Sequence, residues 1–217
     1  MRGCQVISTL LLILCVAGSG FSQIEIGLIG GVNMANLSFD PEDDLDWSRV
    51  TVLGIGAIVE KTLGDQLSVQ YEPMYLQKGS TADVDGIDGA NIEIDLAYIE
   101  IPVMIKYTFP GESIKPYMMA GPTVGFNIKA EKVFSGLPDL TQSLYTNGTY
   151  DIKDDVTYMD FGLGFGAGIC MPVGERVLFV QARYTLGLTN ISNMDDDDDE
   201  VTTNGIQILG GIKIPLN

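Results

Sequence analysis

Residues 92–107, IEIDLAYIEIPVMIKY, decide the fold of this chain. Their β-branched and aromatic side chains alternate between apolar and polar with a period of two, which indicates a β-strand. Apolar residues occupy the even positions up to Tyr98 and the odd positions from Ile99 onward. Because one extra residue sends every later side chain to the other face, the switch predicts a β-bulge near Tyr98 and Ile99. A tilted strand needs about 9–11 residues to cross a bilayer, so this segment is long enough to cross and continue outside.

The N-terminal residues 1–22 have the composition of a secretory signal peptide. Arg2 precedes an apolar run at 6–17, and small residues follow before Ser22. We expect cleavage after Ser22, which leaves residues 23–217 as one exported domain. The apolar run is too short for a transmembrane helix. Leu14 before Cys15 disfavours lipoprotein processing, which requires a small residue at that position.

Composition narrows the class of protein further. The chain has 29 Asp and Glu against 12 Lys and Arg, a net charge of −17, which argues against nucleic-acid binding because that depends on basic side chains. Beyond residue 22 only Cys170 remains, so no intramolecular disulfide stabilises the domain. The chain is 46% hydrophobic, yet no later apolar run approaches the roughly 20 residues of a spanning helix. A soluble β-barrel with an apolar interior and a membrane barrel with an apolar exterior both remain open.

The spacing of the strand-like segments favours the membrane barrel. Eight segments are predicted at 24–35, 49–61, 66–78, 92–107, 115–129, 156–171, 176–188 and 205–216. Long, mostly acidic loops alternate with tight turns between them. An even number of antiparallel strands with this alternation is typical of outer-membrane barrels. We therefore predict an all-β, eight-stranded, antiparallel up-and-down transmembrane β-barrel with short periplasmic turns and long extracellular loops.

Glycine supports a polar interior. The non-apolar face of 156–171 is largely glycine, which suits close approach of bulky partners rather than contact with solvent. Because the interior of an eight-stranded barrel is only just wide enough for side chains, we expect long polar residues to fill it. Paired acids and bases are tolerated there, and Glu72 and Glu100 are expected to pair with Lys106 and Arg183. The predicted lumen network comprises Gln70, Glu72, Glu100, Lys106, Asp160, Gln181 and Arg183.

Four segments carry a family resemblance: residues 27–37, 98–107, 116–122 and 182–191. In these segments the chain resembles the porin-family, PorT-like outer-membrane β-barrel proteins common in Bacteroidetes. The resemblance implies an eight-stranded barrel surrounded by outer-membrane lipid and inserted by the outer-membrane assembly machinery. It supplies no shared catalytic residues. Such barrels usually end on an aromatic residue, whereas this chain ends on Asn217.

Histidine is absent from the whole chain, which excludes Ser-His-Asp and Cys-His nucleophile systems and any histidine-ligated metal. We therefore expect no catalysis and no cofactor. The sharpest acidic feature is the run Asp195, Asp196, Asp197, Asp198 and Asp199. Carboxylates suit Ca²⁺ or Mg²⁺, so weak cation binding is conceivable, although a solvated, self-repelling loop is the favoured interpretation.

The predicted function is a structural or surface-binding role with no catalysis. Its partner would be an unidentified extracellular or envelope component. The alternative is a narrow, porin-like channel for water, ions or small solutes, which a lumen filled by Glu, Lys and Arg disfavours. A membrane enzyme is the third hypothesis, and the missing histidine counts against it.

Overall fold

A computed structural model describes residues 23–40, 46–84, 86–87, 89–137, 146–193 and 200–216. The predicted signal peptide, residues 1–22, lies outside them. The described residues form antiparallel β-strands and one short 3-10 helix. The elements are β1 (Ile24–Asp40), β2 (Trp47–Thr62), β3 (Leu67–Tyr71), β4 (Met74–Asp83), β5 (Asn91–Thr108), β6 (Lys115–Ser135), β7 (Gly148–Asp151), η2 (Lys153–Asp155), β8 (Met159–Val173), β9 (Arg176–Gly187) and β10 (Glu200–Leu216).

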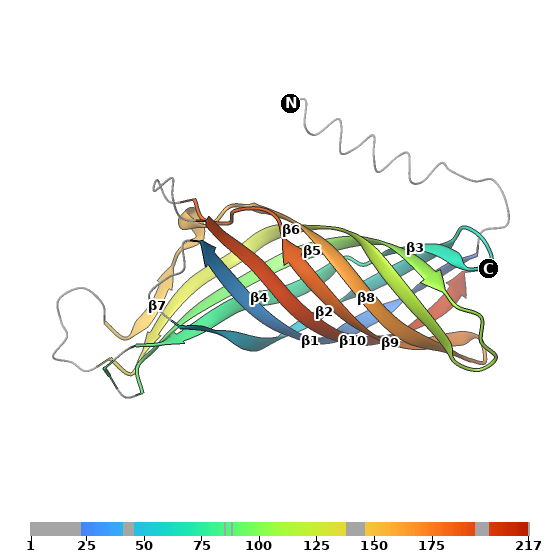
Figure 1. The fold of residues 1–217 in the computed structure, drawn as a ribbon, viewed down its shortest axis with the longest axis horizontal. Coiled ribbons are helices and arrows are strands. Elements are labelled where there is room, and N and C mark those ends of the chain that lie inside the picture. The colour runs from blue at the N-terminus through green and yellow to red at the C-terminus, as the bar shows by residue number, and fades with distance from the viewer. Residues whose placement is uncertain are drawn as a thin grey trace, which may run out of the picture.

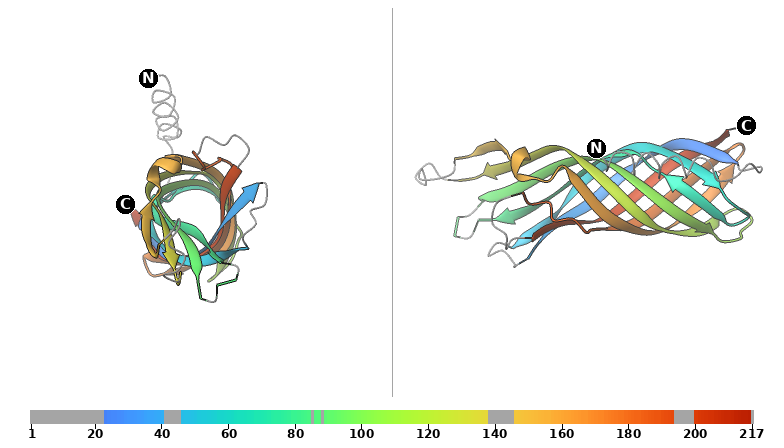
Figure 2. Two further views of the ribbon diagram at one scale, coloured as in Figure 1. Left: turned by 90° about the vertical axis from the view of Figure 1, so that its left-hand side faces the viewer. Right: turned by 90° about the horizontal axis from the view of Figure 1, so that it is seen from above.

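The strands close into a ring of eight positions (Figures 1 and 2). β1 pairs with β10 on one side and β2 on the other, and β10, β9, β8, β6 and β5 follow in order. β3 and β4 share the eighth position, because both pair with β2 and β5. Pro73 separates them, and proline cannot donate a ladder hydrogen bond. The predicted eight-stranded antiparallel architecture is confirmed.

The two ends of the barrel differ. At the turn end lie the short connections 63–66, 109–114 and 174–175, together with the start of β1 and the end of β10. At the opposite end, which we call the loop end, β4, β5, β6 and β7 project beyond the other strands (Figure 1). The strands extend further into the loops than the sequence predicted. β7 and η2 also form inside the stretch 130–155 that was predicted to be a loop.

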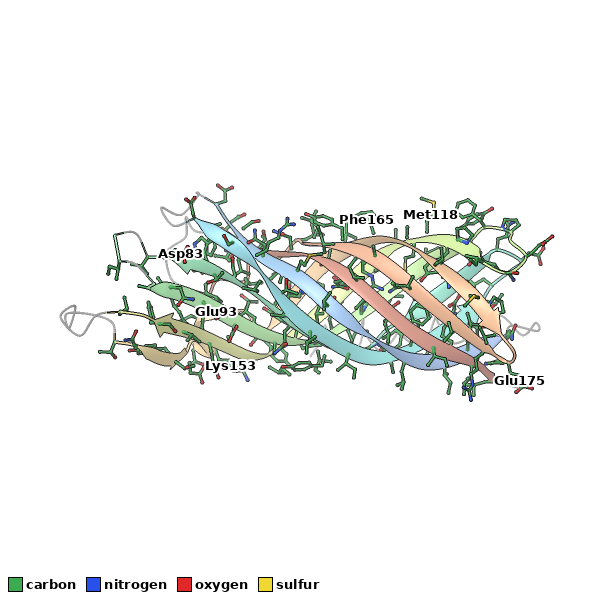
Figure 3. All side chains as sticks on the ribbon, turned by 90° about the horizontal axis from the view of Figure 1, so that it is seen from below. Asp83, Glu93, Met118, Lys153, Phe165 and Glu175 are labelled. Atoms are coloured by element: carbon green, nitrogen blue, oxygen red, sulfur yellow. The ribbon has the colours of Figure 1, made fainter. Side chains whose placement is uncertain are left out.

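The outer wall is apolar. Side chains such as Phe165 and Met118 project outward from it (Figure 3) and are 51% and 57% exposed. So large an apolar surface on a barrel matches a lipid-facing wall. None of the described residues forms a helix with the length and apolarity needed to cross a membrane. Other exposed members of the wall include Leu28, Leu53, Ile55, Ile105, Ile169, Val180, Ile208 and Ile214.

The predicted β-bulge within 92–107 is wrong. The β4–β5 ladder runs unbroken from Met74 opposite Glu100 to Asp83 opposite Asn91, so the even residues of β5 face inward along its whole length. The register does shift opposite Ala97 and Tyr98, but the extra residue belongs to β6, where Ala97 pairs with Lys129 and Tyr98 with Asn127. It is therefore the side chains of β6 that change face.

What changes along β5 is its surroundings. From Ile99 onward the apolar residues at odd positions face out, whereas Ile94 and Leu96 face in and leave Glu93 and Asp95 outside. Apolar inside and polar outside is the pattern of a barrel wall in water. Leu96 belongs to a cluster that we call the apolar cap, and the phase switch marks the level at which the lipid-facing wall ends. The buried members of the apolar cap are Leu37, Leu96, Tyr98, Ala130 and Ile191.

The outer wall yields a first prediction. Phe165→Arg places a charge on the lipid-facing surface and should destabilise the barrel by about 2–4 kcal/mol. Asp83→Arg, at the exposed loop end, should cost less than about 1 kcal/mol. Denaturant unfolding in lipid vesicles, followed by the fluorescence of Trp47, measures both. Equal stability of the two variants would show that Phe165 does not face lipid.

Candidate functional site

The structure buries all seven residues of the predicted lumen network, each 3% exposed or less. Glycines in β8 provide the space, and Gly164 faces Arg183 as expected, 3.5 Å from its Cδ to an added Cβ, but other partners come closer. A Cβ added at Gly164 would lie 2.3 Å from Cε of Met104, and one at Gly168 would lie 2.6 Å from the ring of Tyr117. A thioether and an aromatic ring therefore occupy much of the room that the glycines leave.

The middle of the lumen holds one ion pair. Nη2 of Arg183 donates to Oε2 of Glu72, and Nε2 of Gln70 donates to the other carboxylate oxygen. Both charged side chains are fully buried. Nearby, the hydroxyl of Tyr117 donates to Oε1 of Gln181 over 3.0 Å. Four of the seven predicted residues are thus engaged in this central layer.

A second group, the turn-end cluster, consists of Glu25, Glu60, Lys106 and Lys213. Nζ of Lys106 lies 3.0 Å from Oε2 of Glu60, and Lys213 contacts the same carboxylate. Lys213 also lies 2.5 Å from Oε2 of Glu25. Two ammonium groups therefore face two carboxylates, and the charges balance. Ser68 adds a hydrogen bond of 2.6 Å to Glu60.

A third group, the loop-end cluster, consists of Lys78, Glu100, Asp160 and Thr203. Nζ of Lys78 lies 2.8 Å from Oε2 of Glu100 and 3.0 Å from Oδ2 of Asp160. The hydroxyl of Thr203 donates to Oδ2 of Asp160 over 2.8 Å. Lys78 therefore bridges β5 and β8 across the interior.

The pairing expected from sequence holds only for Arg183 with Glu72; Glu100 and Lys106 pair with other residues. Lys78, Glu60 and Lys213 were missed. Strand phase could have found all three. Lys78 shares the even phase of Gln70 and Glu72, Glu60 is out of phase with the apolar face of 49–61, and Lys213 stands between Ile212 and Ile214.

The lumen is not purely polar. A cluster of buried apolar residues shares the interior with the ion pairs, so those pairs lie in surroundings of low polarity where an unpaired charge is costly. The interior is therefore packed like a protein core. Its members are Ile29, Ile58, Met74, Leu76, Met104, Tyr117, Met119, Cys170, Phe179 and Leu209.

The loop end carries the acidic surface. Burial raises the pKa of Glu93 above its ordinary value, and the neighbouring charge of Asp95 adds to this effect. Lys129 lies 2.9 Å from Glu131 on the same wall, and its pKa is raised by the hydrogen bond to that carboxylate. The run 195–199 lies outside the described residues. Among those described, no three Asp, Glu, Cys or His residues are grouped to hold a metal ion.

The central ion pair yields a second prediction. Glu72→Gln leaves the guanidinium of Arg183 buried without its counter-charge, which should destabilise the barrel by about 3–5 kcal/mol. The double variant Glu72→Leu/Arg183→Met removes both charges and should recover most of that loss. Denaturant unfolding in lipid vesicles measures the stability of both variants. A double variant less stable than Glu72→Gln would contradict the assigned coupling.

The raised pKa of Glu93 yields a third prediction. The pKa of Glu93 in the folded barrel lies above its ordinary value of 4.5. Protonated Glu93 therefore contributes its full stability below pH 4.5, and this contribution is lost as pH rises through the folded-state pKa. Glu93→Gln should therefore match the parent at low pH and become more stable relative to it as pH rises. In an Asp95→Asn background, the difference in stability between Glu93→Gln and its parent should be smaller. Parallel stability profiles of Glu93→Gln and the parent would refute the prediction.

Comparisons with known proteins agree with this architecture. The family model described as outer membrane protein beta-barrel domain matches residues 19–193. No curated protein sequence matches the chain.

Two solved structures with TM-scores of 0.50 or more support the same fold, and a third is similar below that level. Outer membrane protease OmpT from Escherichia coli is similar at 9% identity over 89% of this chain and 97% of that one, with a TM-score of 0.52. OprG from Pseudomonas aeruginosa is similar at 11% identity over 90% and 96%, with a TM-score of 0.50. Neisserial surface protein A is similar at 13% identity over 91% and 98%, with a TM-score of 0.46.

Identities this low show the fold alone. The narrower PorT-like, Bacteroidetes-type assignment stays a prediction. With residues 19–193 matched and a ring of eight strands observed, the chain belongs to the outer membrane protein beta-barrel domain family, which implies a place in the bacterial outer membrane.

Proposed function

We propose that this barrel is non-catalytic and holds an acidic surface outside the membrane, where it binds a positively charged partner from the cell surface or envelope. The packed lumen is the observation that carries the proposal. A barrel whose interior is filled by its own side chains has its outward-facing end left for contact with other molecules.

Packing disfavours the channel alternative. Charged side chains cross the interior at three levels: Lys106 with Glu60, Arg183 with Glu72, and Lys78 with Asp160. Buried apolar residues lie among them, and the apolar cap is a further buried apolar cluster toward the loop end. A passing hydrated ion would have to displace both paired charges and packed apolar groups.

Charge supports a cationic partner. The described residues at the loop end carry more acids than bases, and a surface of one sign attracts the opposite sign and speeds association. Glu93 and Lys153 lie on this projecting part, whereas Glu175 lies at the opposite end (Figure 3). The acids are Asp40, Asp46, Asp83, Glu93, Asp95, Glu131, Asp151, Asp154, Asp155 and Glu200, and the bases are Arg49, Lys129, Lys132 and Lys153.

Chemistry supports the absence of catalysis. The whole chain lacks histidine, and the central carboxylate Glu72 is bound to Arg183 and Gln70 instead of being held free for acid–base work. Similarity to an outer-membrane protease at 9% identity concerns the fold and not the activity.

Binding of poly-L-lysine to the barrel in zwitterionic lipid nanodiscs tests the proposal. We expect binding that weakens with salt and falls several-fold in Glu93→Gln/Asp95→Asn/Glu131→Gln. The matched control Asp65→Asn/Glu112→Gln/Glu175→Gln removes three charges only at the turn end and should bind like the parent. Equal loss in both variants, or none in the first, would overturn the proposal. Single-channel recording in planar bilayers covers the alternative, since discrete conductance steps would favour the channel.

A further inference from the structure

The loop-end cluster differs from the other two charged layers in its charge balance. In the turn-end cluster two ammonium groups face two carboxylates, and in the middle one guanidinium faces one carboxylate. In the loop-end cluster the single ammonium of Lys78 contacts both Glu100 and Asp160. With both acids ionised, one negative charge remains without compensation, at side chains 3% exposed or less. A buried charge of this kind is costly unless something pairs with it.

Unpartnered oxygens mark where a compensating ligand would sit. Lys78 engages only Oε2 of Glu100 and Oδ2 of Asp160. Across the described part of the chain, Oε1 of Glu100, Oδ1 of Asp160 and Oδ1 of Asn127 have no hydrogen-bond partner, and neither has the neighbouring hydroxyl of Tyr98. Unpartnered polar atoms also occur elsewhere in the lumen, on Asn33, Gln70, Gln181, Arg183 and Gln207. The amide nitrogen of Asn127 donates to the carbonyl oxygen of Lys129 over 3.1 Å, which identifies its other atom as the free acceptor. Asn127 is 2% exposed and carries no charge, so it is independent of the acidic pair.

Strand register brings these three residues to one place. Glu100, Gly125 and Asp160 stand in one cross-strand row over β5, β6 and β8, and Asn127 is the next inward residue of β6. Gly125 adds no side chain to the group, and the ring of Tyr98 packs against it. A Cβ there would lie 3.1 Å from the ring of Tyr98 and 3.7 Å from Cβ of Asp160.

We propose that Glu100, Asp160 and Asn127 form a binding site for a small monovalent cation of the sodium class. Hard cations are bound by oxygen, and the free atoms here are carboxylate and amide oxygens. One positive charge would neutralise the layer, whereas a neutral water molecule would leave its charge unchanged. Lys78 disfavours a divalent ion by adding positive charge beside the site. This proposal does not depend on the proposed surface-binding role.

Unfolding of the full barrel in neutral-detergent micelles tests the site. Sodium chloride replaces N-methylglucamine chloride at constant ionic strength and pH, so that only the cation changes. Sodium at ten times its dissociation constant should raise the folding equilibrium constant about tenfold relative to sodium-free buffer. Asp160→Asn removes the excess charge and should abolish the response. The matched control Asp83→Asn, an exposed acid, should retain it.

Two further variants keep the test decisive if Asp160→Asn does not insert. Asn127→Leu removes one ligand oxygen without changing charge and should weaken the sodium response. Lys78→Met leaves both carboxylates uncompensated and should strengthen it. No sodium response in the parent, an unchanged response in Asn127→Leu, or a response to Ca²⁺ alone would overturn the proposal. So would stabilisation by acid in place of sodium, because a proton would then be the compensating charge.

Discussion

The structure depends on one constraint: each strand of a closed barrel presents one face to lipid and the other to a narrow interior. The alternation of side chains then decides everything else, because apolar residues such as Phe165 must face outward and their neighbours inward. Among the described residues, each position of the closed ring is paired on both sides, which is what allows a β-structure to lie in lipid.

The narrow interior is filled by two kinds of side chain, paired charges and apolar groups. Arg183 and Glu72 are buried charges that stabilise each other, and the surrounding Met104, Tyr117 and Phe179 fill the remaining space. Removing one partner of such a pair is costlier than removing both. The lumen is thus a core in which ion pairs connect opposite strands, and both roles that we propose lie outside this central packing, at the loop end and at the cluster around Lys78.

The alternation of side chains along each strand predicted which residues face the lumen. Phase placed Glu72, Glu100, Lys106 and Arg183 on the inner face, and the structure buries them there. Pairing was not predictable, because partners such as Lys78 with Asp160 come from strands far apart in the chain and meet only across the ring. The change in the apolar pattern near Tyr98 reflects a real structural change, but a bulge in β5 is not its cause. The even residues of β5 keep one face while the medium outside changes from lipid to water, and the extra residue sits in β6.

By itself the sequence determined the eight positions of the ring, the alternation of turns and loops, and which face of each strand is apolar, since these patterns are local. Only the tertiary structure decided which charges meet, that apolar side chains and a cap fill the lumen, and that one acid is left unbalanced. The physical reason is that barrel closure and strand tilt set which residues share a level of the interior, and no local pattern contains that information.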